Sequence, residues 1–186
     1  AAARIAKWDG LSWTALGSGM SGAVRALAVD RNGNLYAGGS FTTAGGVAAV
    51  GIAKWNGTNW SALGSGLNSV ASALVFDEDD NLYAGGDFTT AGGISASRIA
   101  KWDGSSWTSL GSGMNSSVMA LLVDGSGILY AAGGFTTAGG VSASRIANWD
   151  GANWSELGSG LNSYGNALAL DGLGHVCVGG SFVTAG

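Results

Sequence analysis

Residues 99–140 read IAKWDGSSWTSLGSGMNSSVMALLVDGSGILYAAGGFTTAGG, and this pattern occurs four times along the chain with a step of 47 residues. The tryptophan pair Trp102 and Trp107 marks the pattern most clearly. The same step relates these sets: Trp8, Trp55, Trp102, Trp149; Trp13, Trp60, Trp107, Trp154; Ile5, Ile52, Ile99, Ile146; Leu27, Leu74, Leu121, Leu168; Asp30, Asp77, Asp124, Asp171; Phe41, Phe88, Phe135, Phe182. No insertion or deletion breaks the step, so the chain is one unit repeated.

The repeat divides the 186 residues into four units, 1–47, 48–94, 95–141 and 142–186. A chain of this length can bury a sizeable core within one domain. We therefore expect a single domain over residues 1–186. The near-identity of the units is compatible with a complete natural protein, with a segment excised from a longer array and with an engineered ring.

Composition excludes several classes of protein. With 35 Gly but no Pro, 46% apolar residues and eight Trp, the chain does not have the composition of a disordered protein. A net charge of -4 and only eight scattered Lys and Arg argue against a nucleic-acid partner. No apolar run approaches the roughly 18 residues that cross a bilayer, so we expect no membrane insertion.

The third unit shows how the pattern translates into strands. Residues 118–124 (VMALLVD) are rich in strand-forming residues, and the turn Asp-Gly-Ser-Gly that follows leads into a second apolar run, 128–135. Residues 98–102 and 107–110 flank another turn and predict a second hairpin. Residues 136–144 (TTAGGVSAS) are expected to form a longer loop. Glycine interrupts every window of helical periodicity, so helices are not expected.

Four short strands in each unit predict an all-β fold, a β-propeller with one four-stranded blade for every 47 residues. Small Ala26 and Ala28 alternate with Leu27 and Val29, as expected for an inner strand packed between neighbouring blades. The paired tryptophans are expected to fill the wider outer part of the blade. A β-solenoid is the alternative, but its rungs are usually shorter than this unit.

The ring can close in two ways. If the strands of a blade are lettered A to D from the axis outward, the chain begins at strand C (residues 4–8) and finishes just past strand B (residues 176–182). One chain could close a ring of four blades in which the first and last blade is shared between the termini. Alternatively, two chains could join head to tail, each forming half of an eight-bladed dimeric ring, and the partner would then be a second copy.

The repeated phrase resembles the propeller repeats of fungal cortical cell-polarity marker proteins and of related secreted bacterial repeat proteins. The resemblance covers all four units. It rests on the W-D/N-G-x-x-W hairpin (the WDG repeat), the L-G-S-G turn and the G-G-x-F-T-T-A-G-G segment. It implies an extracellular or cell-surface propeller module, and it transfers no catalytic residue to this chain.

One face of the predicted disc is acidic. Its turns carry ten of the twelve acidic residues, against Arg31 alone: Asp9, Asp30, Asp77, Glu78, Asp79, Asp80, Asp103, Asp124, Asp150 and Asp171. The face could bind cations or a basic partner, but aspartate is also the residue that tight turns prefer. The turn 77–81 (DEDDN) could hold Ca²⁺ through oxygen ligands. Because the other units lack these acids, we predict no metal site.

The opposite face is variable. Its loops between strand D and the next strand A are 20–23, 67–70, 114–117 and 161–164, with Arg25, Arg98 and Arg145 nearby. Variation on a constant frame fits an interaction surface, and it also fits neutral drift of loops. Trp8 and Trp13, with their copies, could alternatively stack on sugars, which would give four equivalent weak lectin sites.

No set of side chains suggests an enzyme. Catalysis requires a nucleophile with a base, an acid–base pair or a set of metal ligands. His175 stands alone, and Cys177 replaces the tyrosine of the other units, Tyr36, Tyr83 and Tyr130. We therefore predict no catalytic, metal-binding or cofactor-binding residues. The sequence favours a non-catalytic scaffold that binds an unknown protein or, alternatively, a glycan.

Overall fold

The computed structural model describes residues 2–186, and within them it contains strands and turns but no helix. Three antiparallel four-stranded sheets follow one another along the chain. They are β3 (Val24–Val29), β4 (Leu35–Gly39), β7 (Ile52–Trp55) and β8 (Trp60–Ala62); β9 (Ala71–Phe76), β10 (Leu82–Gly86), β13 (Ile99–Trp102) and β14 (Trp107–Ser109); and β15 (Val118–Val123), β16 (Leu129–Gly133), β19 (Ile146–Trp149) and β20 (Trp154–Glu156). These sheets are blades, so the predicted all-β propeller architecture is confirmed.

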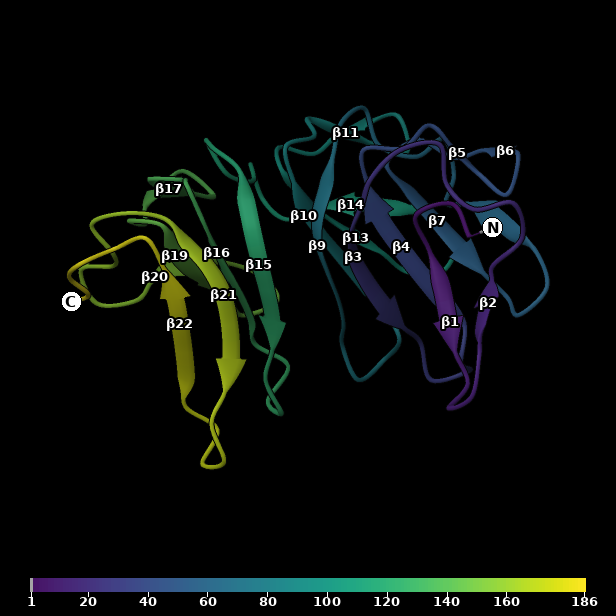
Figure 1. The fold of residues 1–186 in the computed structure, drawn as a ribbon. Helices are drawn as coiled ribbons and strands as arrows, with labels where there is room; N and C mark the ends of the chain where they lie inside the picture. The colour runs from purple at the N-terminus through teal and green to yellow at the C-terminus, as the bar shows by residue number, and fades with distance from the viewer. Residues whose placement is uncertain (1) are drawn as a thin grey trace.

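Two half-blades flank the three complete blades. The first pairs β1 (Ala6–Trp8) with β2 (Trp13–Ala15), and the second pairs β21 (Gly165–Leu170) with β22 (Val176–Gly180). The blades stand side by side in an arc, and the half-blades lie at its opposite ends (Figure 1). The innermost strands of successive blades contact one another along the arc, β3 with β9, β9 with β15 and β15 with β21.

The register is the same in every blade, as near-identical units require. Strand β4 pairs with β7 through Leu35–Trp55, Tyr36–Lys54 and Ala37–Ala53, and the equivalent residues pair in the other two blades. Each A–B hairpin also shifts register near the end of the second strand, for example between Gly85 and Gly86. Such a bulge leaves an unpaired residue and bends the strand.

The segment between strands B and C differs from the prediction. Residues 136–144 were expected to form a loop, yet they contain the small hairpin of β17 (Thr137–Ala138) and β18 (Val141–Ser142). Equivalent hairpins are β5 (Thr43–Ala44) with β6 (Val47–Ala48) and β11 (Thr90–Ala91) with β12 (Ile94–Ser95). Gly139 and Gly140 turn with φ of 59° and 89°, a left-handed conformation that glycine adopts without strain. The two glycines therefore make a tight hairpin possible where the sequence predicted a longer loop.

The core is built from equivalent residues of successive units. Phe41, Phe88 and Phe135 are essentially inaccessible to solvent, as are Ile52 and Ile99. The second tryptophan of each complete blade is also buried, and its indole Nε1 donates a hydrogen bond to a backbone carbonyl of the preceding blade. In the half-blade, by contrast, Trp13 is 69% exposed. The expected place of these rings in the packing between blades is confirmed for Trp60, Trp107 and Trp154.

Candidate interaction face

The loops between strand D and the next strand A lie on the same side of the arc as the small hairpins (Figure 1). The first residue of each loop is buried in the core and forms an isolated β-bridge to the segment that follows strand B: Met20, Leu67, Met114 and Leu161. Part of each loop is therefore scaffold rather than binding surface.

The second residue of each loop is also structural. The Asn115 Oδ1 accepts hydrogen bonds from the backbone N–H groups of Thr136 and Thr137, and its Nδ2 donates to Thr136 Oγ1 at 2.8 Å. The equivalent backbone bonds are accepted by Asn68, by Asn162 and, through its hydroxyl, by Ser21. A polar acceptor at this position thus fastens the loop to the neighbouring segment in all four units.

Sequence variation among the units is concentrated in the loop residues that do not fasten the loop to the scaffold. We define the variable face as the fourth loop residue of each unit together with the residue that follows strand B: Ala23, Ser40, Val70, Asp87, Ser117, Gly134, Tyr164 and Ser181. The backbone frame beneath these side chains is constant, because Ser40, Asp87, Gly134 and Ser181 each donate a backbone N–H to the carbonyl of the paired loop residue. No two units carry the same pair of side chains on this frame.

Neighbouring pairs on the variable face contact each other. Tyr164 is about half exposed, and its ring lies so close to Gly134 of the preceding unit that a Cβ there would approach the ring to 2.6 Å. Likewise, the hydroxyl of Ser117 donates to the carboxylate of Asp87. The face therefore combines an aromatic ring with a carboxylate that is already hydrogen-bonded.

A small pocket opens beside Ser40 and Val70, with a volume of about 180 Å³. Its walls include Val50 and Asn68, so an apolar side chain lies next to the amide that fastens the loop. The variable face thus offers a shallow recess as well as protruding groups.

The predicted arginines beside this face are mostly held by the fold. Arg98 and Arg145 adopt φ near 65°, and each guanidinium donates to a loop carbonyl, of Met114 and Leu161 respectively. Arg25, by contrast, is exposed, and within residues 2–186 its guanidinium makes no hydrogen bond or ion pair. Of the three arginines singled out from the sequence, Arg25 is the one left accessible to a partner.

On the opposite face, the aspartates organise turns. The Asp103 carboxylate accepts hydrogen bonds from the backbone of Ser105 and Ser106 and from both hydroxyls, and the bond from the Ser106 backbone contributes most to lowering its pKa. The equivalent backbone bonds are accepted by Asp9 and Asp150. In the turn between β21 and β22, Asp171 accepts from the backbone N–H groups of Leu173 and His175. These contacts supply a structural reason for the acidic turns that needs no bound cation.

Asp30 is the buried exception among the acidic residues, with 8% of its surface exposed. Burial raises its pKa, but hydrogen bonds from Asn34 and the charge of Lys54, 3.6 Å away, outweigh burial and leave the pKa below its ordinary value. The Tyr36 hydroxyl donates to the same carboxylate.

The same arrangement recurs around Asp77, which accepts the hydroxyl of Tyr83 and lies 3.8 Å from Lys101. Burial and the nearby carboxylate raise the pKa of Tyr83 to about 12. Neither this group of residues nor the one around Asp30 contains a base aimed at a free nucleophile.

The turn 77–81, considered above as a calcium loop, is occupied by internal contacts. The Asp77 carboxylate accepts from the backbone of Asp79 and from the backbone and side chain of Asn81. The Asp80 carboxylate accepts the backbone N–H of Arg31 in the neighbouring blade. Across residues 2–186, no three His, Cys, Asp or Glu side chains converge in a geometry that could hold a metal ion.

The tryptophans proposed as sugar-binding residues lie in two environments. The second rings, Trp60, Trp107 and Trp154, are buried, whereas their partners Trp55, Trp102 and Trp149 are half-buried. The two rings of each pair are tilted, with centroids 5.3–5.4 Å apart. In the complete blades, a sugar could therefore reach only the first ring of each pair, whereas in the half-blade both Trp8 and Trp13 are exposed.

The part of the chain that the structure describes has no helix that could cross a bilayer.

Comparison with known proteins places this geometry in a family. The model of the Rax2 C-terminal beta propeller domain matches residues 9–168. No curated protein sequence matches the chain. Among solved structures, the WD40 repeats of RRP9 share 16% identity with a TM-score of 0.56, covering 81% of this chain and 42% of that one. The extracellular domain of BT4673 from B. thetaiotaomicron shares 11% identity with a TM-score of 0.58, covering 86% and 20%. A chain of the mitotic checkpoint complex shares 13% identity with a TM-score of 0.56, covering 90% and 49%. The chain thus spans less than half the length of each, and the likeness is one of fold.

Proposed function

Because this chain belongs to the Rax2 C-terminal beta propeller domain family, we propose that it is a non-catalytic interaction module that binds a protein partner through the variable face. The observation that carries the proposal is the contrast within each loop. The first two residues of the loop make the same contacts with the segment after strand B in every unit. The fourth loop position, by contrast, carries a different side chain in each unit over an unchanged backbone: Ala23, Val70, Ser117 and Tyr164. Binding surfaces are commonly made in this way, by loops on a rigid scaffold.

The composition of the variable face supports a protein ligand. Tyr164 offers a large ring with few rotatable bonds, a type of residue enriched at the centres of protein interfaces. The pocket beside Val70 could accept one apolar side chain, and exposed Arg25 stands near the same loops. The described residues offer no assembled nucleophile and base, so binding rather than turnover is the activity proposed.

We further propose that the module acts outside the cell or at its surface. The support is the resemblance of its repeats to those of cell-polarity markers and secreted proteins, together with the similarity to an extracellular bacterial domain. Antibody labelling of intact cells of the source organism, compared with permeabilised cells, would test this location. Signal only after permeabilisation would contradict an external location.

Partner binding can be tested with matched variants. Ala23→Arg combined with Tyr164→Ala alters the variable face, whereas Ser126→Arg places the same new charge in an exposed turn of the acidic face. Wild-type protein and both variants would be immobilised, exposed to a cell-surface protein fraction and compared by quantitative mass spectrometry. We expect proteins that are retained by the wild type and by Ser126→Arg and lost with the double variant. Equal retention by all three would contradict the proposal.

Carbohydrate binding is the second candidate, favoured by the half-buried Trp55, Trp102 and Trp149 at equivalent positions. Together with the exposed Trp8 of the half-blade, these rings would make four equivalent sites, which would gain affinity for branched glycans through multivalency. A glycan array probed with wild type and with Trp102→Ala distinguishes this function. Signal that is lost in the folded variant would support a lectin, and a silent array would exclude one on the glycans displayed.

A further inference from the structure

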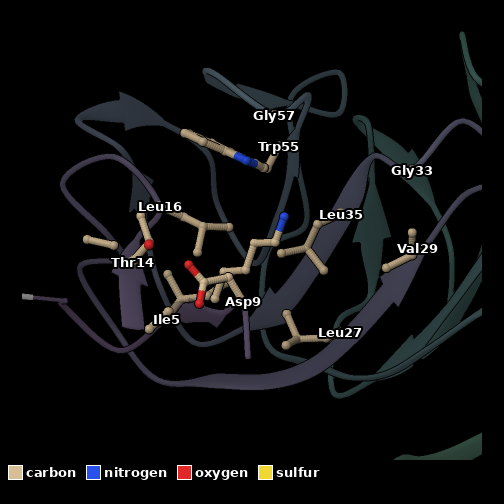
Figure 2. A pocket seen from close by; sticks show the side chains of 13 residues that line it. Ile5, Asp9, Thr14, Leu16, Leu27, Val29, Gly33, Leu35, Trp55 and Gly57 are labelled. Carbon is tan, nitrogen blue, oxygen red and sulfur yellow. The ribbon is translucent and has the colours of Figure 1, made fainter. Parts of the chain in front are cut away.

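A groove lies between the half-blade β1–β2 and the first complete blade (Figure 2). Its volume is about 620 Å³, and its walls are mainly apolar, contributed by Ile5, Leu16, Leu27, Val29, Leu35 and Trp55. Leu27 is 54% exposed here, whereas its counterparts Leu74, Leu121 and Leu168 are partly buried. The groove therefore exposes apolar surface that the other units cover.

The equivalent space in the complete blades shows what covers it. There, Tyr36 of β4 is buried against Phe76 of the next blade, with ring centroids 5.0 Å apart in an edge-to-face arrangement. Tyr36 also faces Lys54 of its own sheet in the β4–β7 register. The groove is therefore the position that an A–B strand pair occupies in the other units.

Each end of the arc has one half of the tryptophan–carbonyl contact that joins neighbouring blades. Trp13 is 69% exposed and, among residues 2–186, makes no bond like that of Trp60 to the Leu16 carbonyl. The counterpart of Leu16 at the other end is Leu157, whose carbonyl receives no tryptophan within the described residues. One end exposes a ring that the other end lacks.

A glycine near the C-terminus also lacks the ring that covers its counterparts. An added Cβ at Gly45 would meet the Trp60 ring at 2.6 Å, because that ring covers the turn of the preceding unit. Gly186 is the counterpart of Gly45, and within the described residues nothing lies within 4 Å of a Cβ placed there. The turn at this end is therefore open to a ring such as Trp13.

We propose that the strand pair β21–β22 of a second copy of this chain fills the groove and completes a shared blade. Strand β22 would pair with β1 in the register of β4 with β7, which sets Cys177 opposite Lys7 and Val178 opposite Ala6. Trp13 would donate to the Leu157 carbonyl, as Trp60 does to Leu16. Lys7 would approach Asp171, as Lys54 approaches Asp30. The interface is thus the continuation of one that the chain already contains three times.

A second copy fits better than closure of one chain on itself. The half-blades lie at opposite ends of the arc (Figure 1), so joining them within one chain would require each blade to turn far more sharply about the axis. That turn would disturb the three tryptophan–carbonyl contacts between neighbouring blades. Two copies instead form two identical interfaces and leave no half-blade open, giving a closed ring of eight blades, within the usual range for propellers.

A disulfide can trap the arrangement, because one of the two cysteines is already present. Residues directly opposite on antiparallel strands have Cα atoms about 4.5–5.5 Å apart, a separation that a disulfide can span. In the Lys7→Cys variant, mild oxidation should therefore join the introduced thiol to Cys177 of the other copy. We expect a covalent two-chain product with both bonds formed, seen by denaturing intact mass spectrometry. Lys101→Cys, which lies opposite Tyr83 inside a complete blade, is the matched control and should not join to Cys177.

Each other outcome contradicts the proposal. A one-chain product with an internal disulfide would show that the chain closes on itself. No bond in the folded Lys7→Cys protein would show that β22 does not pair with β1. A ladder of three or more chains would replace the two-copy ring by an open array. As a second measurement, Trp13→Ala should weaken the association of two copies by about 30-fold or more, the effect of losing a buried interface anchor. Unchanged association would argue against this contact.

Discussion

Trp107 donates its indole N–H to the backbone carbonyl of Leu63, 3.0 Å away and 44 residues earlier in the chain. The bond joins the outer strand of one blade to the end of the outer strand of the preceding blade. It occurs at the same position in Trp60 and Trp154, so it belongs to the repeat rather than to one blade. The fold is therefore held together by contacts that each unit makes with its neighbour, as in other repeat proteins.

Trp107→Phe should destabilise the protein by about 1–3 kcal/mol, because it keeps a buried aromatic ring but removes the indole bond and leaves the Leu63 carbonyl with the Gly66 N–H as its donor. Chemical denaturation followed by circular dichroism measures the change. Trp13→Phe is the matched control, since Trp13 is exposed in the single chain. At protein concentrations where single copies prevail, its effect should be within about 0.5 kcal/mol. Equal effects of the two substitutions would contradict the assigned role of the indole bond.

Phe88→Ala should cost about 3–5 kcal/mol, because Phe88 is fully buried within a complete blade and truncation leaves a cavity. Phe182 occupies the same position of the repeat but is only half-buried in the terminal half-blade. The Phe182→Ala substitution should therefore cost clearly less in the single chain. Urea midpoints of the two variants, measured side by side, provide the comparison. A larger loss for Phe182 would contradict the packing described here.

Asp30 should make stability depend on acidity. Since its folded pKa lies below its ordinary value, its stabilising effect is present at neutral pH and is lost as the pH falls through the folded pKa. Asp30→Asn should cost about 1–3 kcal/mol at pH 7. The difference from wild type should shrink when denaturation is repeated at progressively lower pH, below about 4. Asp124→Asn is the matched control, because Asn148 replaces the lysine opposite its tyrosine. A pH-independent difference for Asp30→Asn would contradict the ion pair.

Two glycines of one turn should respond oppositely to alanine. Gly125 has space around it and an ordinary φ, and other units place Arg31 or Glu78 there, so Gly125→Ala should stabilise by about 0.4–1 kcal/mol. Gly127 has the same open space but a φ of 79°, so Gly127→Ala should destabilise by about 1–2 kcal/mol. Thermal melting of both variants tests the pair. Changes of the same sign would contradict the turn geometry.

Much of the fold could be predicted from the sequence, because the same pattern of strand and turn residues occurs four times. The tryptophan pairs, the turn aspartates and the alternation around Leu27 predict the strands and their order without reference to distant contacts. The hairpin at 137–142 was missed, since two-residue strands carry no periodicity and Gly139-Gly140 indicates a turn without showing what it connects.

The candidate site was less accessible to sequence reasoning. The loops were correctly placed beside one another, but the sequence did not separate Asn115, which fastens its loop, from Ser117, which belongs to the variable face. That separation depends on hydrogen bonds between residues 21–22 positions apart. One signal was available in the sequence: an amide or hydroxyl side chain recurs at 21, 68, 115 and 162, as expected for a structural role.

Native mass spectrometry of the unmodified protein, across a range of protein concentrations, shows whether each half-blade is completed by another copy. We expect a discrete species of two 18.3 kDa chains, which gives way to single chains only on dilution or in Trp13→Ala. A single chain at every concentration, with no difference in assembly between wild type and variant, would contradict completion by another copy.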